Sequence, residues 1–571
     1  MTTIKRGLPR TTAQVTLADG RIFKAPINTP LEAFIQEAEA EKDVPRHLRA
    51  VAALVDNRLR ELTLPVTRDI HVQPVSLGEN DGALIYRRSL CFLLIAAAER
   101  CLPGIKVRID HSLPQRAFFC HVEDRPNFTE EELATIKNCM QEMVAADLPI
   151  ERKQVPLDDA RQMFQNRGDL EKVRLLQFRN RNYLNLYILG DFADYFFGYM
   201  VPSTSYLEWF DLTLVEDGFL LRYPLDDAPD QLAPVGVISK LDDVFRRADA
   251  LLHLLNVGDF GQLNEAIQQG RILELMLVAE ALHERRIAEI GHQVRERHTN
   301  GVRLCLIAGP SSSGKTTFSK RLAVQLMTHG LKPFTMEMDN YFVDRDLTPR
   351  DENGDFDFES LGAINLELFN EHLRSLIAGK LTQLPRFDFK EGRSMPGKEI
   401  QLTPEHVIIV EGIHGLNPDL TPLIPRDQRF HIYVSALTQL NIDRHNRVST
   451  TDVRLLRRIV RDATHRGWTA TDTLTRWNSV RRGEKRNIFP YQEYADALFN
   501  SSLFYELAVL RPIAEPHLLR VSLDHPRWAE ANRLLSFLSW VVPFAPETVP
   551  DNSILREFIG NSILHDYHPG T

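Results

Sequence analysis

Two mainly apolar runs in the second half of the chain predict strands that are buried on both faces. They cover residues 302–308 and 405–411, and each is followed at once by glycine or an acid. Near-continuous apolar runs of this length are typical of the central strands of a parallel sheet. A third run, residues 332–338, predicts another strand, and residues 315–327 predict a helix directly after the first.

Elsewhere apolar residues recur either at every second position, as in strands, or about every 3.6 positions, as in helices. Residues 14–23 alternate on either side of Asp19-Gly20, which predicts a β-hairpin, and residues 29–38 predict an amphipathic helix. A further helix is expected to begin at Tyr86. Later elements are predicted as helices over 238–256, 264–297 and 553–559, a strand over 490–496 and a helix from 499.

The segment between the first apolar run and its helix is a phosphate-binding loop. Residues 309–316 read Gly-Pro-Ser-Ser-Ser-Gly-Lys-Thr, which fits the pattern Gly-x-x-x-x-Gly-Lys-[Ser/Thr] in the required strand–loop–helix context. The glycines allow backbone N–H groups to turn toward phosphates, and the helix N-terminus adds positive potential. The residues predicted to contact the nucleotide are Gly309, Ser311, Ser312, Ser313, Gly314, Lys315, Thr316 and Thr317.

Two carboxylates follow predicted strands, and both belong at the ligand-binding edge of a parallel sheet. Asp339 can accept a proton from an attacking hydroxyl, and Glu411 can serve a metal ion together with Thr316. Mg²⁺ and a nucleoside triphosphate are therefore the expected ligands.

Composition adds little chemistry but limits the alternatives. The chain has 571 residues, a length that predicts three or four domains, and its net charge of −9 gives no overall attraction to nucleic acid or membranes. The five cysteines contain no Cys-x-x-Cys pair, which fits a reducing compartment. No signal peptide or membrane-spanning run is expected, so the predicted location is the cytoplasm.

With these motifs in place, residues 300–525 resemble the uridine kinase and phosphoribulokinase group of kinases, and uridine–cytidine kinases most closely. The resemblance implies that ATP is the donor, that Asp339 is the general base and that Lys315, Arg461 and Arg466 stabilise the transferring phosphoryl group. Residues 457–467 resemble the group's lid helix, within a segment holding ten Lys or Arg residues between Arg454 and Arg486. The residues that the resemblance places around the substrate are Tyr341, Phe356, Asp357, Phe387, Phe389, Arg458 and Arg476.

The positions that read the base in that group differ here. Gly392 stands where a histidine is usual, Trp468 replaces a lid arginine and Arg476 replaces a glutamine. The predicted reaction is phosphorylation of the 5′-hydroxyl of a pyrimidine nucleoside, which leaves uridine, cytidine and thymidine open. A sugar-phosphate kinase resembling phosphoribulokinase is one alternative. The other is an RNA-linked regulator that uses the kinase fold as a nucleotide switch.

Residues 13–225 resemble the start of threonyl-tRNA synthetases, with a TGS domain followed by the domain that edits mischarged tRNA. That editing site uses a His-x-x-x-His pair and then a cysteine and a histidine. The matching positions here are Arg88, Phe92, Phe196 and Met200, so no hydrolysis is expected. Arg88 keeps the ability to bind an anion. A modest basic stretch, Lys172 to Arg181, is compatible with RNA but is better explained as a solvated strand edge.

The expected fold class is therefore multidomain α/β and α+β. We predict a TGS-like β-grasp domain at 1–76, a degenerate editing-like domain at 77–225, a helical connector at 226–299, a doubly wound P-loop kinase domain at 300–525 and a tail packing on it at 526–571. The expected partners are a nucleoside substrate and, by resemblance, further copies of the chain.

Overall fold

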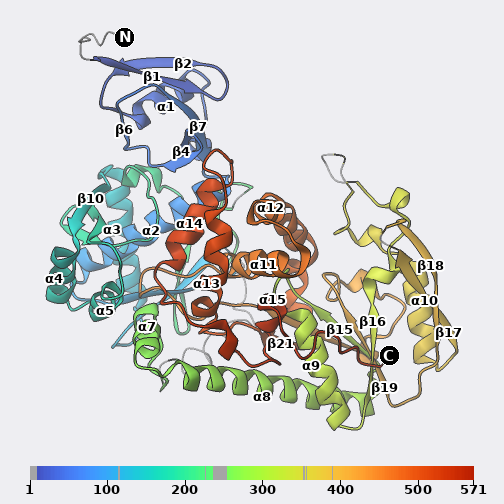
Figure 1. Cartoon of the computed structure of the whole chain (residues 1–571). Helices are drawn as coiled ribbons and strands as arrows, with labels where there is room; N and C mark the ends of the chain where they lie inside the picture. The colour runs from blue at the N-terminus through green and yellow to red at the C-terminus, as the bar shows by residue number, and fades with distance from the viewer. Residues whose placement is uncertain are drawn as a thin grey trace, which may run out of the picture.

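The structure is a computed structural model that describes residues 10–113, 116–225, 227–235, 252, 254–350, 354, 356–388 and 390–570. Figure 1 shows a small β-rich unit at the N-terminus, an α+β unit beside it and a larger sheet-and-helix unit that ends the chain. Most of the helix predicted over 238–256 lies outside the described residues. No helix in the described ranges combines the length and apolar character needed to cross a membrane.

The first unit is a five-stranded sheet covered by one helix. Its strand order is β2-β1-β7-β4-β5, with β1 antiparallel to β2 and parallel to β7. The predicted hairpin at Asp19-Gly20 is confirmed, but the helix begins at Leu31 because Pro30 occupies its N-cap. The bounds are β1 Thr12–Leu17, β2 Ile22–Pro26, α1 Leu31–Ala40, β4 Ala50–Val55, β5 Arg58–Arg60 and β7 Ile70–Ser76.

The second unit is built around a long buried helix, α2. This helix begins at Asn80, six residues before the predicted start at Tyr86. It packs with α3 against a four-stranded sheet of order β13-β14-β9-β8, while β10-β11-β12 form a separate sheet. The bounds are α2 Asn80–Cys101, β8 Val107–Leu113, β9 Ala117–Val122, α3 Glu130–Ala145, β10 Glu151–Pro156, α4 Leu157–Arg167, α5 Leu170–Leu176, β11 Tyr183–Leu189, β12 Phe192–Asp194, β13 Asp211–Val215 and β14 Gly218–Arg222.

Two helices, not one, connect the halves. The single helix predicted over 264–297 is wrong: α7 (Phe260–Gln268) ends before Gly270, whose φ of +76° stops a helix, and α8 (Ile272–Thr299) follows. Apolar residues of α4, α5, α7 and α8 share one hydrophobic core with the C-terminal unit. The connector is therefore continuous with the core of the kinase-like unit.

The C-terminal unit contains the predicted parallel sheet, with strand order β16-β19-β15-β20-β21. Along β15, Leu304 and Leu306 pack with α10 on one face, whereas Cys305 and Ile307 join the large core on the other. Burial on both faces explains the mainly apolar run. The bounds are β15 Leu304–Ala308, α9 Lys315–Thr328, β16 Lys332–Glu337, α10 Leu366–Ile377, β19 His406–Glu411, β20 Arg429–Ser435 and β21 Ala497–Asn500.

A hairpin, β17–β18, and five further helices complete this unit. The strand predicted over 490–496 is wrong: Phe489–Tyr494 is a 3₁₀ helix, and the edge strand is β21. The tail helices α14 and α15 contribute to the large core. The bounds are β17 Thr382–Asp388, β18 Arg393–Ile400, α11 Thr450–Arg466, α12 Ala470–Asn487, α13 Glu506–Leu519, α14 Trp528–Leu538 and α15 Arg556–Ile559.

The loop between β20 and α11, residues 436–449, inserts into the second unit through buried charges. The guanidinium of Arg444, which is 3% exposed, lies 2.6 Å from Asp169 and 2.7 Å from Glu171. His445 Nδ1 lies 2.6 Å from Asp194, whose other oxygen accepts from Lys172 at 2.5 Å. The contacts of Arg444 and His445 join residues more than 240 positions apart in sequence.

We expect Arg444→Ala to destabilise the folded protein by about 3–5 kcal/mol, because it leaves Glu171 without this counter-charge and leaves Asp169 with Arg167 alone. The matched control is Arg46→Ala, since Arg46 pairs with Glu208 on the surface, where such pairs contribute about 0–1 kcal/mol. Calorimetric melting of both variants measures the difference. A loss no larger than that of the control would contradict the role given to Arg444.

Candidate functional site

The phosphate-binding loop adopts the conformation that its sequence predicts. It leaves β15 at Gly309, where a Cβ atom would lie 2.0 Å from the Val434 carbonyl oxygen, and it enters α9 at Gly314, whose φ is +81°. Both positions therefore require glycine. Lys315 Nζ donates to the Pro310 carbonyl at 3.2 Å, and burial lowers the Lys315 pKa.

The loop contains polar groups suited to a triphosphate. Within the described residues, the buried hydroxyls of Ser312 and Ser313 have no hydrogen-bond partner. Buried hydroxyls normally have one, so these two are suited to donate to an anionic ligand. Together with the N–H groups at the start of α9 and Lys315, they fit the phosphates of a nucleotide.

Thr316 and Glu411 are paired at the loop. Thr316 Oγ1 donates to Glu411 Oε1 at 3.0 Å, and β19 brings the acid beside β15. Burial raises the pKa of Glu411 to about 7, and the carboxylates of Glu557 and Asp339 act in the same direction. A hydroxyl and a carboxylate beside a phosphate loop fit Mg²⁺, which takes few protein oxygens and completes its shell from phosphates and water.

Asp339 follows β16 and lies in the 3₁₀ turn Met338–Tyr341, at the same edge of the sheet. The side chain is open to solvent, yet the protein around it desolvates the carboxylate, and this effect and Glu337 raise its pKa. The charge of Lys315 acts in the opposite direction, so the two predicted catalytic residues lie within reach of each other's charge.

The arginines of α11 divide into two groups. Arg454 Nε donates to the Ser311 carbonyl at 2.9 Å, and Arg458 Nη1 donates to the Ser311 hydroxyl at 2.8 Å. Arg457 is fully buried and contacts Ser501 and Glu506. This part of the basic run is therefore fixed beneath the loop. Arg458 therefore contacts the phosphate loop, and its expected place near the sugar stays a prediction.

The second group lies at the C-terminal end of α11. Arg461 and Arg466 both contact the buried Asp462, at 3.5 and 3.2 Å. They line a cavity of about 480 Å³ together with Thr316 and Thr317 of the phosphate loop. The structure thus brings these two predicted arginines to the loop.

The predicted substrate residues have different environments. Tyr341 is 2% exposed, its ring packs on Phe369 and its hydroxyl lies 3.1 Å from His372 Nδ1, so it is a core residue and not a substrate contact. Asp357 pairs with Arg486 at 2.9 Å.

Two of the aromatic candidates, Phe356 and Phe387, are linked by ring contacts through Phe358 and Phe342. Phe356 packs under the Arg350 guanidinium, and Phe387, 8% exposed, packs edge-on to Phe342. Arg476 stacks on Trp468 at 4.3 Å. It lies on α12, which carries neither of these two rings. Phe389 lies outside the described residues.

Sequence reasoning missed Arg345, which lies next to the β17–β18 hairpin, the base-framing hairpin that carries Phe387. Gly392 lies in the β17–β18 turn with a φ of +70°, and a Cβ there would lie 2.9 Å from Arg345 Cβ and 3.0 Å from its Nε. Arg345 N–H also donates to the Gly392 carbonyl at 2.9 Å. The Arg345 guanidinium therefore covers Gly392, the position where the resemblance to uridine–cytidine kinases places a histidine.

The tail was also missed as part of the site. The Glu557 carboxylate accepts from the Thr317 N–H at 3.0 Å, so it occupies a donor in the first turn of α9. Ile554 packs on Gly314, where a Cβ would lie 2.5 Å from Ile554 Cγ2. The tail also lines the 480 Å³ cavity, which includes His565. The only sequence signal was the short amphipathic segment 553–559.

The four editing-like positions in the second unit pack together. Phe92 and Phe196 are 0% and 3% exposed, with ring centroids 5.4 Å apart, and Met200 is 1% exposed. Arg88 lies at their edge and donates to the Tyr199 carbonyl at 2.6 Å. These aromatic and apolar residues form a hydrophobic cluster.

The basic stretch beginning at Lys172 is not a continuous surface. Lys172 is 1% exposed and bonded to Asp194, Arg174 contacts Glu265, and Arg179 stacks on Trp540. The solvated strand edge expected from sequence is therefore wrong for Lys172, which lies on α5 and contributes to the buried charge network.

Comparison with known proteins matches the two halves separately. The model of the phosphoribulokinase / uridine kinase family matches residues 304–504. Uridine kinase from Brevibacillus brevis is 31% identical over 204 residues, which cover 36% of this chain and 86% of that enzyme. D-glycerate 3-kinase from Cryptococcus neoformans has a TM-score of 0.21 and 16% identity, covering 45% of this chain and 87% of the other.

The N-terminal part matches threonine–tRNA ligases. The ligase from Halorhodospira halophila is 30% identical over 210 residues, which cover 36% of this chain. The chain spans only 31% of that ligase. What it shares with the ligases is therefore confined to about a third of their length.

We expect Glu557→Gln to tighten binding of Mg²⁺-ATP by about three- to tenfold. The change removes a negative charge beside the loop and weakens competition for the Thr317 N–H. Titration calorimetry measures the dissociation constant. Asp551→Asn, an exposed tail change, is the control and should alter binding less than twofold. Weaker binding in Glu557→Gln would show that the carboxylate assists the nucleotide and does not compete with it.

Proposed function

Because the chain belongs to the phosphoribulokinase and uridine kinase family, we propose that it transfers the γ-phosphoryl group of ATP to the 5′-hydroxyl of a pyrimidine nucleoside. One observation carries the proposal. Asp339, Lys315 and the Thr316–Glu411 pair meet at one edge of the sheet, where a base, a phosphate-binding cation and a metal-binding pair are needed together.

In the proposed step, the 5′-oxygen of the nucleoside forms a bond to the γ-phosphorus while the bond from that phosphorus to the bridging oxygen of ADP breaks. Asp339 accepts the hydroxyl proton. Lys315, Arg461 and Arg466 stabilise the charge that develops on the transferring oxygens. Mg²⁺, when bound at Thr316 and Glu411, neutralises the phosphates.

For the acceptor, we propose that the sugar lies near Asp357 and the base near Phe387. The Asp357 carboxylate can accept hydrogen bonds from two sugar hydroxyls, and its pairing with Arg486 brings α12 to this position. A reducing cytoplasm suits the five free cysteines. For the N-terminal units we propose a TGS-like and an editing-like scaffold without hydrolytic activity.

A sugar-phosphate acceptor is a second candidate because of Arg345. Its guanidinium covers Gly392 at the base-framing hairpin, and a cation there favours an anionic group over a neutral base. Release of ADP with Mg²⁺-ATP, compared across uridine, cytidine, thymidine and ribulose 5-phosphate, separates the two. Turnover on ribulose 5-phosphate alone would replace the nucleoside proposal. No turnover on any acceptor would favour a nucleotide switch.

We expect Asp339→Asn to lower kcat by about 10²- to 10⁴-fold, because the amide cannot accept the hydroxyl proton. Mg²⁺-ATP binding should stay within twofold of the original protein, since the phosphate loop is unchanged. Asp346→Asn, a change in the loop that follows, is the control and should keep full turnover. Turnover above a tenth of the original in Asp339→Asn would assign the base to another group.

The pH dependence of turnover follows from the same residue. The base must be ionised, and its pKa is raised above the usual aspartate value of about 3.9 by desolvation and by Glu337. Activity should therefore fall as the pH drops through this raised pKa. The measurement is kcat/KM between pH 4.5 and 8. The residual activity of Asp339→Asn should lack this acid limb, and an identical limb in both proteins would contradict the assignment.

A further inference from the structure

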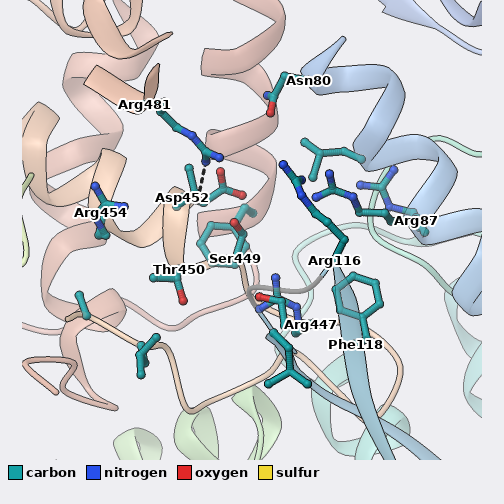
Figure 2. Close-up of a pocket in the computed structure, with 18 of the residues that line it drawn as sticks. Asn80, Arg87, Arg116, Phe118, Arg447, Ser449, Thr450, Asp452, Arg454 and Arg481 are labelled. Atoms are coloured by element: carbon teal, nitrogen blue, oxygen red, sulfur yellow. Dashed lines mark hydrogen bonds between the residues drawn. The ribbon is translucent and has the colours of Figure 1, made fainter. Parts of the chain in front are cut away.

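A second cavity, of about 400 Å³, lies between the editing-like unit and the kinase-like unit. Its walls come from α2 and β9 on one side and from α11, α12 and the 436–449 loop on the other. Figure 2 shows Arg481 extending from one wall and Arg116 from the opposite wall, with Arg447 near Phe118. The volume is within the range of sites for small organic ligands.

The lining of this interunit cavity is strongly basic. Eight Arg or Lys side chains line it, against two carboxylates, Asp452 and Glu530. Asp452 is already bound by Arg533 through two contacts of 2.5 and 2.9 Å. The remaining cations belong to both units, and they include Arg87 and Arg116 from the N-terminal half and Arg447, Arg454 and Arg481 from the C-terminal half.

Two of these guanidiniums lack a protein counter-charge. Arg88 donates to the Tyr199 carbonyl and Arg447 to the Val448 carbonyl. Within the part of the chain that the structure describes, no carboxylate lies within ion-pair distance of either. Burial lowers the pKa of both groups. Partly buried cations without a carboxylate are costly, and a bound anion removes that cost.

The N-terminus of α11 adds to the attraction for an anion. Its first residues, Thr450 to Asp452, line the cavity, and Ser449 at the N-cap makes no side-chain hydrogen bond to the first turn. The unpaired N–H groups of a first helical turn favour negative charge. Aromatic rings line the same cavity from both sides, Phe118 on β9 and Trp477 and Phe489 at α12 and just after it, and together they are its aromatic wall.

We propose that this interunit cavity binds a small phosphorylated compound of nucleotide size, with its phosphates at the arginines and its apolar part on the aromatic wall. The site differs from the 480 Å³ cavity beside Thr316, which lies at the other end of α11. It also extends beyond the editing-like cluster, since Phe92 and Met200 do not line it. A free compound is favoured over RNA because the cavity is closed in by both units.

The site goes beyond the proposed kinase reaction and does not depend on it. Its occupancy would still reach the phosphate loop, because Arg454 lines the cavity and donates to the Ser311 carbonyl at 2.9 Å. Arg454 also contacts Glu484, which accepts from the Ser311 N–H at 2.8 Å. Binding is therefore the direct readout, and a change in the phosphate loop is its expected consequence.

The test is titration calorimetry of the full chain carrying Lys315→Ala, which weakens the phosphate loop. The probes are UTP, ATP and inorganic tripolyphosphate. We expect at least one of them to bind at one equivalent per chain. Adding Arg116→Gln or Arg481→Gln should weaken this binding about tenfold, the loss of one charge-assisted contact. Arg46→Gln, on the exposed surface, is the control and should change it less than twofold.

Melting curves establish that each variant is folded, and the two partly exposed positions Arg116 and Arg481 serve as independent tests of each other. Absence of binding by all three probes would overturn the proposal. So would binding that neither arginine change affects. Displacement of the probe by a tRNA transcript, with the same sensitivity to Arg116→Gln, would assign the cavity to RNA and also overturn it. Because binding is measured without turnover, failure of the kinase proposal leaves this result unaffected.

Discussion

The arrangement of the two halves depends on a buried set of charges around residues 443–446. Burial alone would raise the pKa of Asp194, but Lys172, His445 and Arg167 outweigh it and hold the pKa below the ordinary aspartate range. Asp443 accepts from the N–H groups of His445 and Asn446, which fixes the loop that carries them. Arg444 and His445 meet their carboxylate partners, Asp169 and Asp194, only while both halves are docked.

This constraint extends directly into the phosphate site. The docked loop ends at Ser449, and α11 begins at the next residue. The arginines of the first two turns then contact the loop residues Ser311 and Ser312. The N-terminal half therefore determines where α11 begins, and α11 supports the loop that is suited to bind phosphate. A ligand in the interunit cavity would act on the same helix.

The tail supplies a third support from the far end of the chain. Asn264 on α7 bonds to the Trp540 carbonyl and the Val542 N–H, and Tyr505 and Ser553 share Glu280 of α8. These contacts place α15 over the loop, where Glu557 reaches the Thr317 N–H. In Figure 1 the tail helix α14 lies between the second, α+β unit and α11. The site is thus enclosed by segments from across the sequence.

The sequence by itself determined the features that depend on consecutive residues. The phosphate loop, the hairpin at Asp19-Gly20, the parallel strands and the two acids after them could be predicted because backbone conformation and strand ends are local properties. The helix break at Gly270 is also a local signal, because a glycine with a φ of +76° ends a helix. Only the tertiary structure decided that Arg457 and Tyr341 are buried, that Arg345 covers Gly392 and that Glu557 reaches the loop. Burial and charge pairing depend on residues tens to hundreds of positions away, and no local period records them.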